Sequence, residues 1–117
     1  MGRVRVATLR TSADVVRFKL RRRRAVLFVA NGCDACAKAK TVLRPMKWNG
    51  GWSYAEASLG LHGLWARREG VTAVPTLVVG LTDPAMGLQL RASLEGYFEG
   101  YSETVIEIMD RFTGLAL

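Results

Sequence analysis

The sequence predicts an α/β protein whose central mixed sheet is flanked by helices, in the order βαβαβαββα. Short apolar or alternating runs of strand length recur along the chain, and amphipathic stretches of helix length separate the first of them. The last two runs, joined by a turn, predict a hairpin. Half of the 117 residues are hydrophobic, which is enough for a core without disulfide or metal staples. We therefore expect a single domain over residues 1–117.

The first two strands and the helix between them follow from alternation, capping and apolarity. Residues 4–8 (VRVAT) alternate with period two, as a half-buried strand does. Thr11 or Ser12 is placed to cap the amphipathic stretch SADVVRFKLRR, and Asp14 suits its first turn. Residues 25–30 (AVLFVA) are continuously apolar, which is typical of a strand covered on both faces.

The middle of the chain predicts two more helices with a strand between them. Residues 33–44 are rich in Ala and Lys, which are good helix formers, and Pro45 is expected to end or kink that helix. After the turn WNGGW, residues 52–58 (WSYAEAS) alternate as a strand. Residues 61–69 (LHGLWARRE) favour a short helix, weakened by Gly63.

The C-terminal part predicts a hairpin and a closing helix. Residues 75–80 (PTLVVG) form a strand with proline at its first position, where the missing N–H does least harm. Residues 88–94 (LQLRASL) alternate and return as its partner. Ser102 is expected to cap the last helix, whose apolar face is supplied by Val105, Ile106, Ile108, Met109 and Phe112.

The cysteine content and the hydropathy of the sequence indicate the cellular compartment in which we expect the protein. Two cysteines are too few for the disulfide framework of a small secreted protein. No run approaches the roughly 18–20 apolar residues that span a bilayer, and the N-terminal residues lack the apolar segment of a signal peptide. We expect a reducing, cytoplasmic location and no membrane partner.

The net charge of +7 is dominated by arginine, and its densest run is Arg21–Arg24. This run could meet nucleic acid or an acidic partner, or it could simply end a helix, where cations suit the negative end of the helix dipole. We favour the helix end and expect no nucleic-acid partner, since neither zinc-finger spacing nor an RNP-like aromatic stretch accompanies it. A net basic surface still favours acidic protein partners.

Both cysteines lie two residues apart, directly after a buried strand and at the start of a helix. The unsatisfied N–H groups of a helix N-terminus stabilise a thiolate, and cysteine pKa values in such motifs fall to roughly 3.5–7.5. Cys33 is expected at the exposed helix tip, and Cys36 one turn in and more covered. Cys36 can then attack a mixed disulfide formed at Cys33. This spacing near a βαβ pattern indicates thioredoxin-like redox chemistry.

Three stretches together resemble the thioredoxin/glutaredoxin superfamily. They are VLFVANGCDAC (26–36), GVTAVPTLVVG (70–80) and LQLRASLEGYFEGYSETVIEIM (88–109). The resemblance covers nearly the whole chain and implies the thioredoxin fold and an oxidoreductase of protein disulfides. It also implies electron transfer through the Cys33–Cys36 pair without another cofactor. The implied partners are disulfide-containing proteins and a recycling reductase, and the implied state is a monomer.

The resemblance also assigns roles to individual residues. Cys33 would be the attacking cysteine and Cys36 the resolving one. The Val74–Pro75 peptide bond would be cis and close to the sulfur atoms. The substrate-binding groove would be formed by the backbone at Ala73 and Val74, together with Thr76 and Gly96.

The motif departs from the usual thioredoxin Trp-Cys-Gly-Pro-Cys at three positions. Gly32 replaces the aromatic residue, which opens the approach to Cys33; Tyr97, Phe98 and Tyr101 are candidate substitutes. Asp34 places a negative charge beside the sulfur and opposes thiolate formation, and Ala35 replaces a rigid proline. We therefore expect the pKa of the Cys33 thiol to be less perturbed than in an oxidant of this family, and the cysteine pair to have a reducing rather than an oxidising poise.

A further departure is the buried acid that thioredoxins carry in the strand before the cysteines. Leu27 stands at the corresponding place in this sequence. On the next strand, Glu56 stands where thioredoxins have an aligned lysine. One interpretation is that Glu56 takes over, with a raised pKa, as proton acceptor for Cys36. The other is that Glu56 is an ordinary exposed strand residue.

Two other function classes remain open. In a glutathione-linked, glutaredoxin-like reductase, Lys38, Lys40 and Arg44 would attract the carboxylates of glutathione. In an interaction module, the fold would be kept with an inert cysteine pair. A metal site is not expected. Structural zinc takes four ligands, whereas the sequence has two cysteines and a single histidine, His62, which is expected at the surface.

Overall fold

The computed structural model describes residues 7–116, and their elements follow the expected order βαβαβαββα. The strands are β1 (Ala7–Thr8), β2 (Arg23–Val29), β3 (Trp52–Ser58), β4 (Thr76–Asp83) and β5 (Leu88–Glu95). The helices are α1 (Ser12–Lys19), α2 (Asp34–Leu43), α3 (Leu59–Arg68) and α4 (Tyr101–Leu115), and a 3₁₀ turn, η1 (Pro84–Met86), lies in the β4–β5 hairpin. The first part of the expected strand 4–8 lies outside the described residues. None of the helices in the described range is long and apolar enough to cross a membrane.

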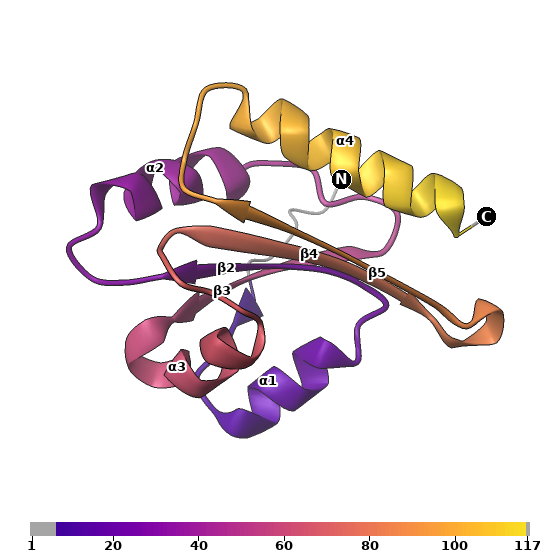
Figure 1. The fold of residues 1–117 in the computed structure, drawn as a ribbon, viewed down its shortest axis with the longest axis horizontal. Helices are drawn as coiled ribbons and strands as arrows, with labels where there is room; N and C mark the ends of the chain where they lie inside the picture. Colours follow the sequence, from indigo (N-terminus) through magenta and orange to yellow (C-terminus); the bar gives the residue numbers. More distant parts are fainter. Residues whose placement is uncertain (1–6, 117) are drawn as a thin grey trace.

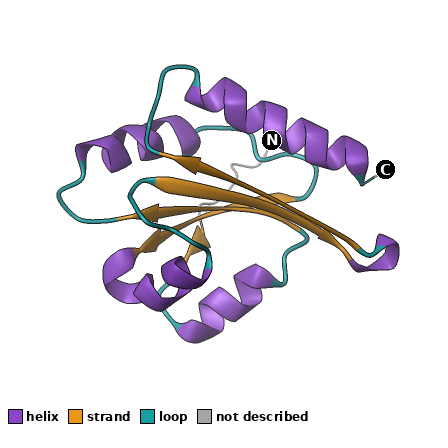
Figure 2. Cartoon of the chain, viewed as in Figure 1, coloured by secondary structure: helices purple, strands orange, loops and turns teal. Residues whose placement is uncertain are grey.

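Within the described residues, one mixed sheet has the strand order β1-β3-β2-β4-β5. β1, β3 and β2 pair in parallel, whereas β4 pairs antiparallel with both β2 and β5. Figure 1 shows α2 and α4 on one face of this sheet and α1 and α3 on the other, and Figure 2 shows the same layers by secondary structure. The predicted fold class, a mixed sheet flanked by helices, is confirmed.

The central strand β2 is buried on both faces, as its continuous apolar run predicted. Leu27 packs into a core cluster with Cys36, Ala39 and Leu43 of α2, while Phe28 packs into a second cluster on the opposite face. Burying such side chains on both faces is the main source of stability for a central strand. Because α2 follows β2 directly, this double burial also holds the start of α2 in place.

The three tryptophans all lie in the core. Trp48 stacks on Tyr54 with ring centroids 4.9 Å apart, and its Nε1–H donates to the Leu43 carbonyl oxygen. Trp65 meets Phe28 edge-on at 5.1 Å. The tryptophans therefore pack inside the protein and do not form an exposed aromatic surface.

The arginine run does not end a helix as expected. α1 already ends at Lys19, and Arg23 and Arg24 are the first residues of β2. Arg23 donates to the Gly50 carbonyl oxygen, and Arg24 donates to Thr82 Oγ1 on β4. The expectation is wrong because the second half of the run belongs to β2, where the guanidinium groups of Arg23 and Arg24 find acceptors on neighbouring segments.

Two further expectations need correction. His62 is buried, not at the surface, since α3 is kinked at this residue and its Nε2 lies 2.6 Å from the Leu9 carbonyl oxygen. Gly100, with φ +80°, is the N-cap of α4 in place of Ser102. At the start of α1, by contrast, Thr11 and Asp14 form the complete capping box, so the expected cap is confirmed.

Candidate active site

The cysteine pair lies at the edge of the sheet where β2 ends and α2 begins. The chain leaves β2 through a turn in which Gly32 has φ +70°, a conformation that favours glycine. Cys33 is then the N-cap residue of α2, and Cys36 lies in its first turn. The two form a disulfide, with Cα atoms 5.2 Å apart. The turn and the helix start therefore bring both sulfur atoms together at the helix tip.

The helix N-terminus makes a direct contact with one sulfur. The backbone N–H of Cys36 donates to Cys33 Sγ at 3.1 Å, in the position that a Ser or Asp side chain usually takes at an N-cap. After reduction, the same donor and the positive end of the helix dipole would stabilise a thiolate at this atom. The start of α2 therefore places a backbone donor at Cys33 Sγ, while activation of a Cys33 thiolate stays a prediction.

The two cysteines differ in their access to solvent. Cys33 is partly exposed, whereas Cys36 is 1% exposed and belongs to the core cluster under α2 and α4. Asp34, between them, is exposed, and Ala35 is partly exposed. Cys33 is therefore the more accessible of the two residues, and Cys36 is shielded from solvent.

The segment before β4 forms the second part of the site. The Val74–Pro75 peptide bond is cis, and Pro75 is fully buried. Thr76 Oγ1 donates to the Ala73 carbonyl oxygen at 2.7 Å, which closes the turn before the proline. Val74 and Cys33 are both partly buried and pack against the same core cluster. The structure thus places the predicted groove residues Ala73, Val74 and Thr76 on one short segment beside this cluster.

The turn after β5 is tied to the same segment. The backbone N–H of Gly96 donates to the Pro75 carbonyl oxygen at 2.7 Å. Tyr97 and Phe98 follow, each 37% exposed, and both rings contact the buried ring of Tyr101 at 5.4 and 5.1 Å. The predicted groove residue Gly96 is therefore fixed against the proline segment, with two partly exposed aromatic rings next to it in the chain.

Glu56 does not fit either interpretation made from the sequence. It points to the same face of the sheet as Tyr54, but its carboxylate accepts two hydrogen bonds from Arg44, at 2.8 and 2.6 Å, and one from Tyr54 Oη at 2.9 Å. Burial acts to raise its pKa, but these hydrogen bonds together lower the pKa below its ordinary value. The expected raised pKa is wrong because the carboxylate is ion-paired, and the exposed alternative is wrong because its side chain is only 13% exposed.

The contacts of Arg44 and Tyr54 with Glu56 were not predicted from the sequence. Arg44 is the C-cap residue of α2, and Tyr54 precedes Glu56 by two residues on β3. The guanidinium of Arg44 reaches Glu56 on β3 because α2 ends at that point. In the sequence, Arg44 is a basic residue before a proline and Glu56 is part of an alternating strand, and neither pattern indicates that the two side chains pair.

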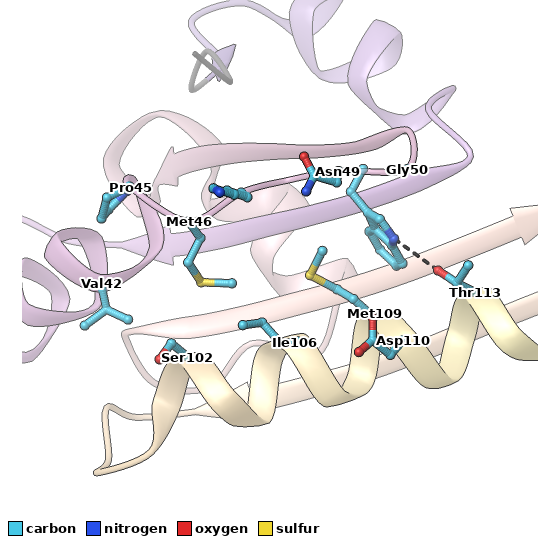
Figure 3. A pocket seen from close by; sticks show the side chains of 12 residues that line it. Val42, Pro45, Met46, Asn49, Gly50, Ser102, Ile106, Met109, Asp110 and Thr113 are labelled. Carbon is cyan, nitrogen blue, oxygen red and sulfur yellow. Dashed lines mark hydrogen bonds between the residues drawn. The ribbon is translucent and has the colours of Figure 1, made fainter. Parts of the chain in front are cut away.

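One hollow of the described structure lies away from the cysteines. A hollow of about 680 Å³ lies between the α2–β3 connection and α4. Figure 3 shows Met46 and Met109 facing one another across it, and a hydrogen bond from Trp52 Nε1 to Thr113 Oγ1 at its side. None of the predicted site residues lines this hollow. Between residues 7 and 116, no group of three or more His, Cys, Asp or Glu side chains is placed to hold a metal ion.

The topology and the disulfide-bonded CxxC pair at the start of α2 together define a thioredoxin fold. No protein-family model matches the sequence, and no curated protein matches it either. Solved thioredoxin structures do match. A mutant thioredoxin from Halobacterium salinarum is 17% identical, with a TM-score of 0.77, over 97% of this chain and 95% of that one.

Two further thioredoxins show the same fold. The thioredoxin from Plasmodium falciparum is 14% identical, with a TM-score of 0.76, over 93% of this chain and 90% of that one. Oxidised thioredoxin O2 from Arabidopsis thaliana is 18% identical, with a TM-score of 0.72, over 91% of this chain and 95% of that one. The resemblance stated from the sequence is thus confirmed at the level of the fold.

Proposed function

We propose that this protein is a thiol–disulfide oxidoreductase that reduces protein disulfides by dithiol exchange at Cys33 and Cys36. The observation that carries the proposal is the hydrogen bond from the Cys36 backbone N–H to Cys33 Sγ, at the accessible start of α2. It is supported by the asymmetry of exposure, because a partly exposed attacking sulfur next to a buried resolving sulfur suits sequential exchange.

The exchange proceeds in two balanced steps. The Cys33 thiolate attacks one sulfur of the substrate disulfide, that S–S bond breaks, and one substrate cysteine leaves as a thiolate. Cys36 then loses its proton and attacks Cys33 Sγ, which releases the second substrate thiolate and forms the Cys33–Cys36 disulfide. The substrate gains two electrons and two protons, and a recycling reductase must return them to the cysteine pair.

The ion pair of Arg44 favours dithiol exchange over glutathione-linked reduction. Arg44 was one of three cations expected to attract the carboxylates of glutathione. Both guanidinium contacts that the structure gives it are made to Glu56, so its charge is already compensated within the protein. Lys38 and Lys40 remain on α2, but single lysines along an exposed helix are more often a solvated face than a binding site.

The partners follow from the same chemistry. We propose disulfide-containing proteins as substrates, bound along the backbone at Ala73 and Val74, and a reductase that recycles the pair. A reducing, cytoplasmic compartment suits a catalytic disulfide that must be re-reduced after each turnover. The exposed Asp34 next to Cys33 favours a reducing rather than an oxidising poise, because a carboxylate disfavours the reactive thiolate beside it.

An insulin-reduction assay with separate thioredoxin-reductase and glutathione recycling tests this proposal. We expect turnover with the wild type and none with Cys33→Ser. Cys36→Ser should accumulate a mixed disulfide with the substrate, visible by non-reducing electrophoresis and mass spectrometry. Turnover that is unchanged in Cys33→Ser, or wild-type protein that is inert with both recycling systems, would rule the proposal out and favour an interaction module.

A further inference from the structure

A second recess lies on the face of the sheet that is turned away from the cysteine pair. It has a volume of about 210 Å³ and lies where the ends of α1 and α3 meet β4 and β5. Val26, Val78 and Trp65 line it and belong to the core cluster under α1 and α3, whereas Cys36 belongs to the cluster under α2 and α4. Figure 1 shows these two helix pairs on opposite faces of the sheet. The recess is therefore separate from the proposed thiol–disulfide site.

A glycine in β4 lies beneath one of the arginines of this recess. Gly80 pairs with Arg24 of β2 on one side and with Arg91 of β5 on the other. Directly paired residues point to the same face of a sheet, so both arginine side chains flank the position where Gly80 carries none. A Cβ at Gly80 would lie 3.4 Å from Cζ and Nη2 of Arg24, which shows that this guanidinium lies over the glycine.

Positive charge dominates the lining of the recess. Lys19, Arg24 and Arg91 are its cationic side chains and Glu69 is its anionic one, which leaves a net formal charge of +2. Glu69 is already engaged, because Arg91 donates from Nε to its carboxylate at 3.2 Å and from Nη2 to its carbonyl oxygen. Lys19 Nζ lies 5.5 Å from the ring centre of Trp65, which holds its charge near the recess.

Arg24 retains unused hydrogen-bond donors in this recess. Its Nη1 donates to the Arg21 carbonyl oxygen at 3.0 Å and to Thr82 Oγ1 at 3.2 Å, while Nε and Nη2 have no acceptor among the described residues. No carboxylate in that part of the chain forms an ion pair with it. Burial lowers its pKa, and the charge of Glu69 opposes this only in part. A partly desolvated guanidinium without a counter-ion is costly, so an anion would bind there with a net gain.

We propose that this recess, named here the Arg24 recess, binds the phosphate group of a small molecule. A doubly charged phosphate balances the +2 lining, whereas a single carboxylate would leave one charge uncompensated. The planar guanidinium of Arg24 presents Nε–H and Nη2–H as a fork that matches two phosphate oxygens. A recess of this small volume favours one phosphate group over the extended backbone of a nucleic acid.

Titration of the ¹⁵N-labelled protein with inorganic phosphate, at constant ionic strength set with NaCl, tests the Arg24 recess. We expect saturable NMR shifts confined to the amides of Gly80 and Arg91 and to Arg24 Nε. Arg24→Gln should weaken binding about tenfold or more, because it removes a charge-assisted pair of hydrogen bonds. The matched control Arg111→Gln, on α4 at the opposite face, should leave binding unchanged.

Two further variants keep the test decisive if Arg24→Gln fails to fold. Lys19 lies at the exposed end of α1, and Lys19→Gln removes its positive charge from the recess. Gly80→Ala adds a methyl group to the floor of the recess. Each substitution should weaken phosphate binding. A parallel titration with glycerol 3-phosphate distinguishes the two sources of the group: tighter binding than inorganic phosphate indicates a phosphate monoester as ligand, and weaker binding indicates free phosphate.

Three results would overturn the proposal. The first is shifts that are uniform over the protein and do not saturate. The second is undiminished phosphate affinity in all three recess variants. The third is tight binding of a single-stranded oligonucleotide that depends on Arg22 and Arg68 as strongly as on Arg24, which would indicate a diffuse polyanion surface. Insulin reduction should be unaffected in the recess variants, so failure here is distinguishable from failure of the proposed redox function.

Discussion

Arg44 at the end of α2 and Glu56 in β3 form a two-pronged ion pair, with N–O distances of 2.8 and 2.6 Å. The guanidinium is about half exposed and the carboxylate largely covered. The pair ties the far end of the helix that starts at the cysteines to the strand next to β2. It therefore couples the position of α2, and hence of its N-terminus, to the central sheet.

Glu56→Gln is expected to destabilise the fold at neutral pH by about 1–3 kcal/mol, because it weakens charge-assisted hydrogen bonds from Arg44 and Tyr54. The pKa of Glu56 is lowered in the folded protein. Its stabilising contribution is thus fully present above the pKa of the unfolded carboxyl and is lost as the pH falls through the folded pKa. Urea unfolding of both proteins from pH 7 down to pH 3 should show their stabilities converging.

The matched control for this experiment is Glu107→Gln, which breaks an exposed ion pair with Arg111 on α4 and should cost less than about 0.5 kcal/mol. A stability difference that grows as the pH falls would contradict the ion-pair explanation. Glu56→Gln also tests the discarded role of Glu56 as proton acceptor for Cys36. That role predicts that thiol–disulfide exchange at Cys36 loses its pH dependence in this variant. We expect that pH dependence to persist.

The sequence revealed the order of elements and the position of the cysteine pair because both depend on local patterns. Apolar periodicity indicates each helix and strand. A CxxC motif that follows an apolar strand lies at the start of a helix whichever strands pair with that strand in the sheet. The Arg44–Glu56 pair, the buried His62 and the Arg24 recess were not predictable in this way. Each depends on a tertiary relationship: where α2 ends above β3, how α3 is kinked, and which residue faces Gly80 across the ladder.

Two buried tyrosines should respond in opposite directions to loss of their hydroxyl. Tyr54 Oη donates to Glu56 at 2.9 Å, so Tyr54→Phe should cost about 1.5–3 kcal/mol of stability. Burial raises the pKa of Tyr101 to about 12, and its hydroxyl has no hydrogen-bond partner among the described residues. Tyr101→Phe should therefore be neutral or stabilising by up to about 1 kcal/mol. Urea unfolding of the two variants side by side measures the difference, and an equal loss in both would contradict these environments.

Asp34→Asn is expected to make Cys33 react at lower pH. The carboxylate beside Cys33 opposes thiolate formation, and its removal should shift the pH midpoint of alkylation downward, by less than about one unit because Asp34 is exposed and screened. The rate of iodoacetamide labelling of the reduced protein against pH measures this shift. Asp110→Asn, at an exposed position of α4, is the control and should leave the midpoint in place. The shift should also shrink at high salt, and an upward shift would refute the electrostatic role of Asp34.

Two glycine-to-alanine substitutions should separate backbone strain from side-chain space. A Cβ at either Gly32 or Gly63 would meet no atom within 4 Å, so neither substitution causes a clash. Gly32 has φ +70° in the turn before Cys33, and Gly32→Ala should cost about 1–2 kcal/mol because an L-residue is strained in that conformation. Gly63 lies within α3, and Gly63→Ala should add up to about 1 kcal/mol, since alanine loses less entropy than glycine in a helix. Denaturant midpoints of the two variants against the wild type test the pair. If Gly32→Ala were as stable as the wild type, the left-handed turn that delivers Cys33 to the tip of α2 would not be a requirement of the fold.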